Sequence, residues 1–252
     1  MVRRNWIGCW SLLWLGLAGL GAQAAEVQVA VAANFSGTMR VLSQVFQQES
    51  GHQASIITGA TGKFYAQIKN GAPFQVLLAA DAQTPLLLEE EGFAVPGSRF
   101  TYAVGRLVLW SKQPDFVDAK GDVLRSARFK RLAIADPRLA PYGAAAVQVL
   151  EQMGAMAQVK DRLVQGDSVA QAYQFVASGN AELGFIASSQ LVVNGQPMAG
   201  SSWLVPESLH SPLRQDALLL KSGQANPAAI ALMVFLQSPR ARAVMREHGY
   251  TH

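Results

Sequence analysis

Short apolar runs alternate with helix-patterned segments along most of this chain, and this alternation constrains the fold more than any other feature. Residues 27–31 are predicted to form a strand, and residues 39–50 carry apolar side chains at helical spacing. The runs at 76–80 and 183–186 are almost entirely apolar, which is typical of strands buried within a parallel sheet. Strands that alternate with helices predict a sheet covered by helices on both faces. The chain is therefore expected to be an α/β protein.

The alternation runs through two series of elements, one from residue 27 and one from residue 132. Two such series predict two α/β lobes with a cleft between them, and open parallel sheets bind ligands beyond the carboxyl ends of their strands. The other expected elements are strands at 54–57, 132–135, 162–164 and 217–220, a long β-prone run at 102–111, and helices at 63–70, 82–91, 144–153, 169–178, 227–236 and 239–248, with residues 112–130 irregular.

The first 24 residues have the pattern of a secretory signal peptide. Arg3 and Arg4 precede an apolar run at 6–20, and Ala22-Gln23-Ala24 follows it directly as a small-residue cleavage site. An uncleaved membrane anchor is the alternative, but the apolar run falls short of the roughly 20 residues that a bilayer-spanning helix needs. We therefore expect residues 1–24 to be a signal peptide that is cut after Ala24.

Cysteine content and charge exclude several classes of function for the expected mature chain. The only cysteine is Cys9, inside the signal peptide, so no disulfide and no thiolate metal site are expected. Loss of Arg3 and Arg4 takes the basic residues from 21 to 19 against 17 acidic residues, which leaves a net charge of about +2. These charges are scattered along the chain without a basic run, and this pattern argues against a nucleic-acid partner.

Four strand-to-helix turns carry the residues that we expect to bind a ligand, namely Asn34, Thr61, Tyr142 and Val169. Taken singly, each has a plainer explanation, because Asn34 and Thr61 suit helix caps and Tyr142 and Val169 suit hydrophobic packing. Taken together, four helix starts at strand ends offer free backbone N–H groups and the positive ends of helix dipoles. The turns contain no cation except Lys63, which is expected to face solvent. They predict a neutral cage for one small oxyanion.

An enzyme on the same fold is disfavoured by the sequence. The histidines, His52, His210, His248 and His252, do not stand beside a serine, a carboxylate or each other at the spacing of a triad or a metal site. The chain also lacks a nucleotide-hydrolase phosphate loop. We expect a binding protein with no catalytic residue.

Five stretches resemble the periplasmic molybdate-binding proteins of ABC importers: Ala33-Asn34-Phe35-Ser36-Gly37-Thr38, Asn70-Gly71-Ala72-Pro73, Gly97-Ser98-Arg99-Phe100-Thr101-Tyr102-Ala103, Ala140-Pro141-Tyr142-Gly143 and Ala177-Ser178-Gly179. The resemblance implies a type II periplasmic binding protein that binds molybdate or tungstate and uses no cofactor and no metal cation. It also implies a monomer that hands its ligand to the membrane permease and ATPase subunits of an importer. The implied contacts come from Ala33, Asn34, Thr61, Tyr142 and Val169.

The resemblance also implies the lobe boundaries. Lobe one would comprise residues 26–104 and 215–252, and lobe two residues 105–214, each with a mixed, mainly parallel sheet flanked by helices. Two crossing strands, near 102–105 and 213–216, would form the hinge between the lobes. A carrier of sulfate or another tetrahedral oxyanion is the alternative function, because sulfate shares the charge and symmetry of molybdate and the sequence does not give the pocket size.

The chain departs from the pattern of the family at three places. Ala33 stands where close relatives have threonine, so a hydroxyl contact is absent there. Thr61 stands where serine is usual, which keeps the hydroxyl and adds a methyl group. Ala187-Ser188 stands where many members place a ligand tyrosine, and the branch that carries asparagine in the first turn also lacks this tyrosine.

Overall fold

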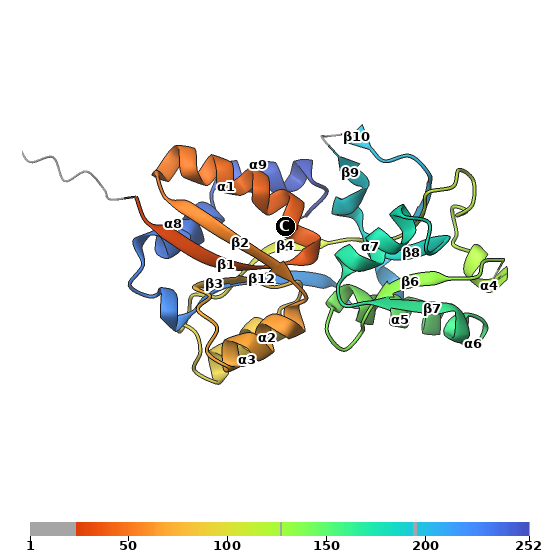
Figure 1. Ribbon diagram of the computed structural model, residues 1–252, viewed down its shortest axis with the longest axis horizontal. Coiled ribbons are helices and arrows are strands. Elements are labelled where there is room, and N and C mark those ends of the chain that lie inside the picture. The colour runs from red at the N-terminus through yellow and green to blue at the C-terminus, as the bar shows by residue number, and fades with distance from the viewer. Residues whose placement is uncertain (1–23, 127, 194–195, 252) are drawn as a thin grey trace, which may run out of the picture.

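A computed structural model describes residues 24–126, 128–193 and 196–251, which form two five-stranded mixed sheets flanked by helices (Figure 1). The predicted α/β architecture of two lobes is confirmed, and each sheet contains two parallel and two antiparallel strand pairings. Residues 1–23 of the predicted signal peptide lie outside the described residues. Within the described residues no helix is both long and apolar enough to cross a bilayer.

The first sheet has the strand order β2-β1-β3-β12-β4. Its inner strand β1 sends Val27, Val29 and Val31 into the core beneath one set of helices, whereas Ala30 faces the opposite set. Since successive side chains of a strand point to opposite faces, β1 is apolar from Val29 to Ala32, where both of its faces are buried. The strands are β1 (Glu26–Ala32), β2 (Gln53–Gly59), β3 (Val76–Leu78), β4 (Phe100–Gly105) and β12 (Leu213–Leu219), and the helices are α1 (Ser36–Ser50), α2 (Thr61–Lys69), α3 (Gln83–Glu90), α8 (Pro227–Phe235) and α9 (Pro239–Glu247).

The second sheet has the strand order β11-β5-β8-β6-β7. Strands β5, β6 and β8 are buried along their whole length, as their apolar sequences predict for inner strands. Its elements are β5 (Leu107–Ser111), β6 (Leu132–Ala135), β7 (Leu163–Gly166), β8 (Leu183–Ala187) and β11 (Ser201–Leu204), with helices α4 (Val123–Ser126), α5 (Pro141–Gln152), α6 (Met156–Val159) and α7 (Val169–Ala177) and a small hairpin of β9 (Val192–Val193) and β10 (Gln196–Pro197).

Five short 3-10 helices complete the described elements. The first, η1, joins β1 directly to α1, so that β1, η1 and α1 together form the first strand-to-helix turn. The third, η3, follows β8 and faces this turn from the second lobe. Their bounds are η1 (Ala33–Phe35), η2 (Lys160–Arg162), η3 (Ser188–Leu191), η4 (Glu207–Leu209) and η5 (Lys221–Gly223).

The β-prone run at 102–111 is not one strand. It breaks at Arg106, so that β4 belongs to the first sheet and β5 to the second. The chain returns to the first sheet through β12, in which Leu213 pairs with Gly105. The two crossings between the sheets therefore lie side by side (Figure 1).

The carboxyl-terminal segment also reaches this crossing. The N–H of Val104 donates to the carbonyl of Thr251 over 2.7 Å, and the N–H of Thr251 donates back over 3.2 Å. Figure 1 shows the end of the chain beside β4, between the two lobes. The last residues are therefore part of the junction.

Candidate functional site

A small cavity between the lobes is lined by all five residues that the sequence analysis selected. The volume of this cavity is about 10 Å³. Its walls come from the starts of four helical segments, two from each lobe, together with the last residues of β1 and β2 and Ala80, which follows β3. The lining residues are Ala32, Ala33, Asn34, Gly59, Ala60, Thr61, Ala80, Ala140, Pro141, Tyr142, Ser168 and Val169, and none of these is charged.

Thr61 is the first residue of α2, and its side chain is 1 % exposed. Its Oγ1 accepts a hydrogen bond from the backbone N–H of Ala80 over 3.0 Å. Because the oxygen serves as the acceptor in that bond, the hydroxyl proton remains available as a donor. The backbone N–H of Thr61 stands at a helix start, where the helix supplies no acceptor. Thr61 can thus offer an anion two donors.

Asn34 lies in η1, and its side chain is held by buried partners. Its Nδ2 donates to Oε1 of Gln215 over 2.9 Å and to the hydroxyl of Tyr250 over 3.1 Å. Its Oδ1 is buried and has no hydrogen-bond partner among the described residues. Sequence analysis predicted an amide donor at this position, whereas in this arrangement the amide protons are already used inside the fold. The backbone N–H of Asn34 remains at the start of the helical segment.

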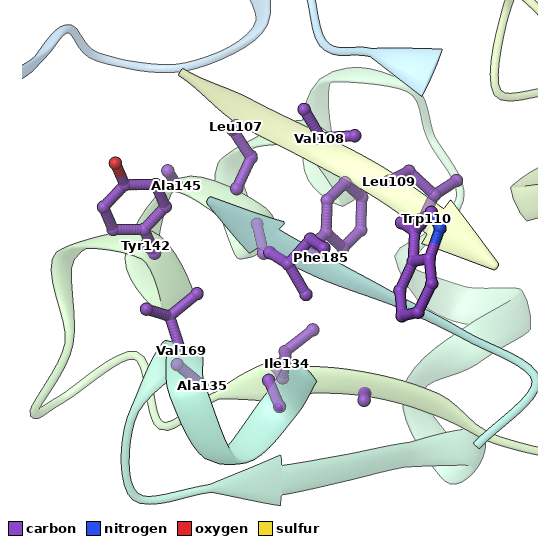
Figure 2. Close-up of a cluster of buried hydrophobic side chains, with 14 of the residues drawn as sticks. Leu107, Val108, Leu109, Trp110, Ile134, Ala135, Tyr142, Ala145, Val169 and Phe185 are labelled. Carbon is purple, nitrogen blue, oxygen red and sulfur yellow. The ribbon is translucent and has the colours of Figure 1, made fainter. Parts of the chain in front are cut away.

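Tyr142 and Val169 contribute backbone groups, and their side chains belong to the core of the second lobe (Figure 2). Val169 is the first residue of α7, which follows the cap residue Ser168. Tyr142 is the second residue of α5, after Pro141. Both N–H groups therefore stand in the first turn of a helix, where no intrahelical acceptor exists. The positive ends of both helix dipoles favour a negative charge there.

The remaining predicted residue, Ala33, forms part of the apolar wall of the cavity. Ala32, Ala33, Ala60 and Ala80 of the first lobe pack in one cluster with Tyr142 and other residues of the second lobe. The lobes therefore touch each other around the cavity. The small side chains let the helix starts of both lobes approach a common point.

Two charged side chains bridge the lobes outside the cavity. The Nζ of Lys63 lies 2.5 Å from Oδ2 of Asp167, and both side chains are largely exposed. Lys63 thus forms a surface ion pair, and this agrees with the expectation that it faces solvent. Exposed pairs contribute at most about 1 kcal/mol, so the electrostatics of the cavity depend mainly on the backbone dipoles.

Three buried tyrosines near the cavity are held neutral. Burial raises the pKa of Tyr102 and Tyr142 well above the usual value, and the neighbouring phenol of Tyr250 raises both further. Burial likewise raises the pKa of Tyr250 to about 12. These phenols therefore bring no negative charge near an anion at neutral pH.

Sequence analysis did not predict the residues that hold Asn34 in place. Gln215, Tyr250 and Ser189 all contact Asn34, from β12, the carboxyl-terminal segment and η3. Each is far from Asn34 along the chain, and no local pattern marks it. Tyr250 follows the last predicted helix and is in none of the strand-to-helix turns from which the site was predicted.

A larger, more open groove of about 480 Å³ lies beside the cavity and shares Ala80, Ala140 and Pro141 with it. It is lined partly by charged side chains, including Asp81, Arg138 and Arg214. None of the predicted site residues lines this groove, whose walls include the starts of α2 and α3 of the first lobe and of α5 of the second. Among the described residues there is also no cluster of three or more potential metal ligands. The small cavity is therefore the candidate site.

Known proteins resemble this chain over nearly its whole length. Residues 27–251 match the family model of bacterial extracellular solute-binding proteins. The molybdate-binding protein ModA of Azotobacter vinelandii is 55% identical over 238 residues, which cover 94% of each chain. ModA of Rhodobacter capsulatus is 49% identical and covers 94% of this chain and 92% of its own.

Solved structures agree with these sequence relationships. The periplasmic molybdate-binding protein of Azotobacter vinelandii superposes with a TM-score of 0.87 at 40% sequence identity, over 90% of this chain and 99% of the other. The match includes both lobes and the junction between them. The chain therefore belongs to the bacterial extracellular solute-binding protein family and, within it, to the family of the periplasmic molybdate-binding proteins.

Proposed function

We propose that this protein binds molybdate, or tungstate, in the cavity between its lobes. The observation that carries the proposal is the convergence of four helix starts on one uncharged cavity, with Thr61 and the N–H groups of Tyr142 and Val169 as donors. Hydrogen bonds to a charged group are worth roughly 1.5–3 kcal/mol each, so several together can hold a dianion without a cation. The full proposed set is Ala33, Asn34, Thr61, Tyr142 and Val169.

The identity of the ligand is supported by the relatives. Both named relatives at about half sequence identity or more are molybdate-binding proteins. Sulfate, the alternative tetrahedral dianion, is smaller than molybdate, and we expect donors spaced for molybdate to hold it less well. Protonated phosphate would bring an O–H group that needs an acceptor among donors. Tungstate has almost the same size and charge as molybdate and is expected to compete with it.

The proposed role is capture and delivery. The protein would act as a binding protein and not as an enzyme, would need no cofactor, and would reach the periplasm through a signal peptide that is cut after Ala24. It would present the closed lobes to the permease and ATPase of an ABC importer. Support comes from the relatives, which are periplasmic molybdate-binding proteins.

We also propose that the lobes move relative to each other, with residues 26–104 and 215–252 as one body and 105–214 as the other. The adjacent crossings at Gly105 and Leu213 support this division, because a pair of neighbouring strands can bend as a hinge. Donors on both lobes favour the closed form only when the anion is present.

Calorimetric titration of the mature protein tests the ligand. Molybdate and tungstate should bind with similar affinities, and each should displace the other. Sulfate and phosphate should displace molybdate only at far higher concentration. Displacement by sulfate at a concentration comparable to molybdate would overturn the assignment in favour of a general oxyanion carrier.

A further inference from the structure

The side chain of Gln215 lies beneath the cavity and forms hydrogen bonds with predicted site residues of both lobes. This side chain is 0% exposed and lies on β12, one of the two strands at the crossing. Its Oε1 accepts from Nδ2 of Asn34 over 2.9 Å, and its Nε2 donates to the hydroxyl of Tyr142 over 3.2 Å. Asn34 belongs to the first lobe and Tyr142 to the second, so one amide side chain connects both halves of the site.

The backbone around Gln215 is shaped to admit this connection. The pairing of β12 with β4 shifts register between Gln215 and Asp216, and Tyr102 is the extra residue on β4. The hydroxyl of Tyr102 lies 3.0 Å from Oε1 of Gln215 and 2.9 Å from the carbonyl of Ala79. Irregularities of this kind re-aim side chains and are frequent beside functional sites.

Gly105 provides the space for the contact between Gln215 and Tyr142. A Cβ atom at this position would stand 2.0 Å from the hydroxyl of Tyr142 and 2.5 Å from Nε2 of Gln215. The backbone of Gly105 does not have a positive φ, so its conformation does not require glycine. The requirement comes from the two side chains that occupy the space.

The unpartnered Oδ1 of Asn34 indicates a role in binding for the hydrogen bonds that Gln215 makes. In the described arrangement, Gln215 and Tyr250 hold Nδ2 of Asn34, and Oδ1 is left buried without a partner. Asn34 lines the cavity, and an anion there would be better served by an amide donor than by this unpartnered oxygen. If both amides turn over, Nε2 of Gln215 donates to Oδ1 of Asn34, and the phenol of Tyr142 donates to Oε1 of Gln215. Nδ2 of Asn34 then occupies the free end as a donor.

We propose that Gln215 is a positioning residue for the anion site: its amide sets which end of the Asn34 amide is free, and it couples that choice to Tyr142 on the other lobe. This proposal rests on the proposed function, since the anion is the one described above. Gln215 itself does not line the cavity. It acts through Asn34 and Tyr142, and no covalent step is involved.

The test measures molybdate affinity and unliganded melting temperature for variants of the mature protein. Gln215→Met removes the hydrogen bonds to Asn34, Tyr102 and Tyr142 at similar volume and should weaken binding at least fivefold, since the roughly 1 kcal/mol of one neutral hydrogen bond corresponds to about fivefold. Gln215→Glu can only accept and holds Nδ2 of Asn34 away from the anion, so its loss should exceed that of Gln215→Met. Asp216→Asn is the matched control. Asp216 is the next residue and is equally buried, but its carboxylate accepts hydrogen bonds from Arg99 and Thr101 and not from Asn34 or Tyr142.

If Gln215 had only a structural role, the effects of substitutions at Gln215 and Tyr142 on affinity would be independent. The test therefore also measures whether these two effects depend on each other. Tyr142→Phe keeps the backbone N–H and removes the phenol, and it should weaken binding several-fold in the wild-type background but not in Gln215→Met. In an amide-resolved NMR spectrum, the side-chain NH₂ signals of Asn34 and Gln215 should both shift when molybdate is added. If Gln215→Met does not fold, Tyr142→Phe tests the same proposal, because it also removes the hydrogen bond between Gln215 and Tyr142.

Three results would overturn this role. These are wild-type affinity in Gln215→Met, an equal loss of affinity in Asp216→Asn, or additive effects of Gln215→Met and Tyr142→Phe. They differ from a failure of the proposed function, in which the wild-type protein itself would not bind molybdate.

Discussion

The backbone N–H of Gly62 donates to the backbone carbonyl of Leu139 over 2.9 Å, from the first turn of α2 in one lobe to the segment before α5 in the other. This bond lies next to Thr61, so it joins the lobes at the edge of the cavity. A Cβ atom on residue 62 would stand 3.1 Å from both the Cα and the carbonyl oxygen of Leu139. A side chain at position 62 would therefore press against the backbone of Leu139 when the lobes are closed.

We predict that Gly62→Ala weakens molybdate binding three- to tenfold without lowering the melting temperature of the unliganded protein. Alanine favours a helix over glycine by up to about 1 kcal/mol, whereas its methyl group opposes the closed form. Gly37→Ala is the matched control, since Gly37 is also the second residue of a helix and nothing lies within 4 Å of its Cβ position. Calorimetry should show unchanged affinity in this control. Equal effects of both substitutions would contradict the interlobe contact.

Val169→Pro should keep the fold and weaken molybdate binding by about one to two decades. Proline removes the N–H that we assign as a donor, and its loss corresponds to roughly 1.5–3 kcal/mol. The position accepts proline because it is the first of α7, and Ser168 before it is extended, with φ −148° and ψ 165°. Val169→Ala is the control that keeps the N–H and should lower stability more than affinity. A proline variant with wild-type affinity would exclude this donor.

Substitutions of Thr61 should affect binding and folding together. Thr61→Ser keeps the hydroxyl, and we expect it to retain wild-type affinity within about threefold. Thr61→Val has nearly the same shape but leaves the buried N–H of Ala80 without its acceptor, which costs about 1–3 kcal/mol of stability. It also removes the donor to the anion. The melting temperature and the molybdate affinity of Thr61→Val should therefore both fall, and a loss of only one of them would refute the double role.

The buried tyrosines predict a loss of stability at alkaline pH. The pKa of Tyr250 is raised from 10.0 to about 12 in the folded protein. A raised pKa means that folding favours the neutral phenol, so this contribution to stability is constant below pH 10 and is lost as the pH rises towards 12. The melting temperature should stay level from pH 7 to about 9.5 and then fall, and less steeply in Tyr250→Phe. Titration of all phenols with midpoints near 10 in the folded protein would disagree with their burial.

Local sequence signals predicted the elements and the turns of the site, because each depends on neighbours along the chain. The start of α7 follows from the cap residue Ser168 and an apolar helix face, whereas α5 begins at Pro141, three residues before the expected start at 144. All five predicted residues line one cavity for this reason. Parallel strands bring their carboxyl ends to the same edge of a sheet, so helix starts that follow them converge.

What the sequence did not predict depends on contacts between distant residues. Gln215 and Tyr250 lie 181 and 216 positions from Asn34, and only the folded chain shows that they hold its amide. The break of the β-prone run at Arg106 is equally non-local, because both halves have strand-forming sequences and differ only in the sheet that they join. The hydrogen bond from the N–H of Ala80 to Oγ1 of Thr61 joins residues 19 positions apart, and no local pattern predicted it.

A crystal of the mature protein grown with molybdate tests the central claim most directly, with anomalous diffraction measured at the molybdenum absorption edge. We predict one strong anomalous peak between the lobes, with oxygens of the anion within hydrogen-bonding distance of Thr61 Oγ1 and of the N–H groups of Tyr142 and Val169. A peak in the larger groove beside Arg138, or no ordered molybdenum in a protein that binds molybdate in solution, would contradict the account.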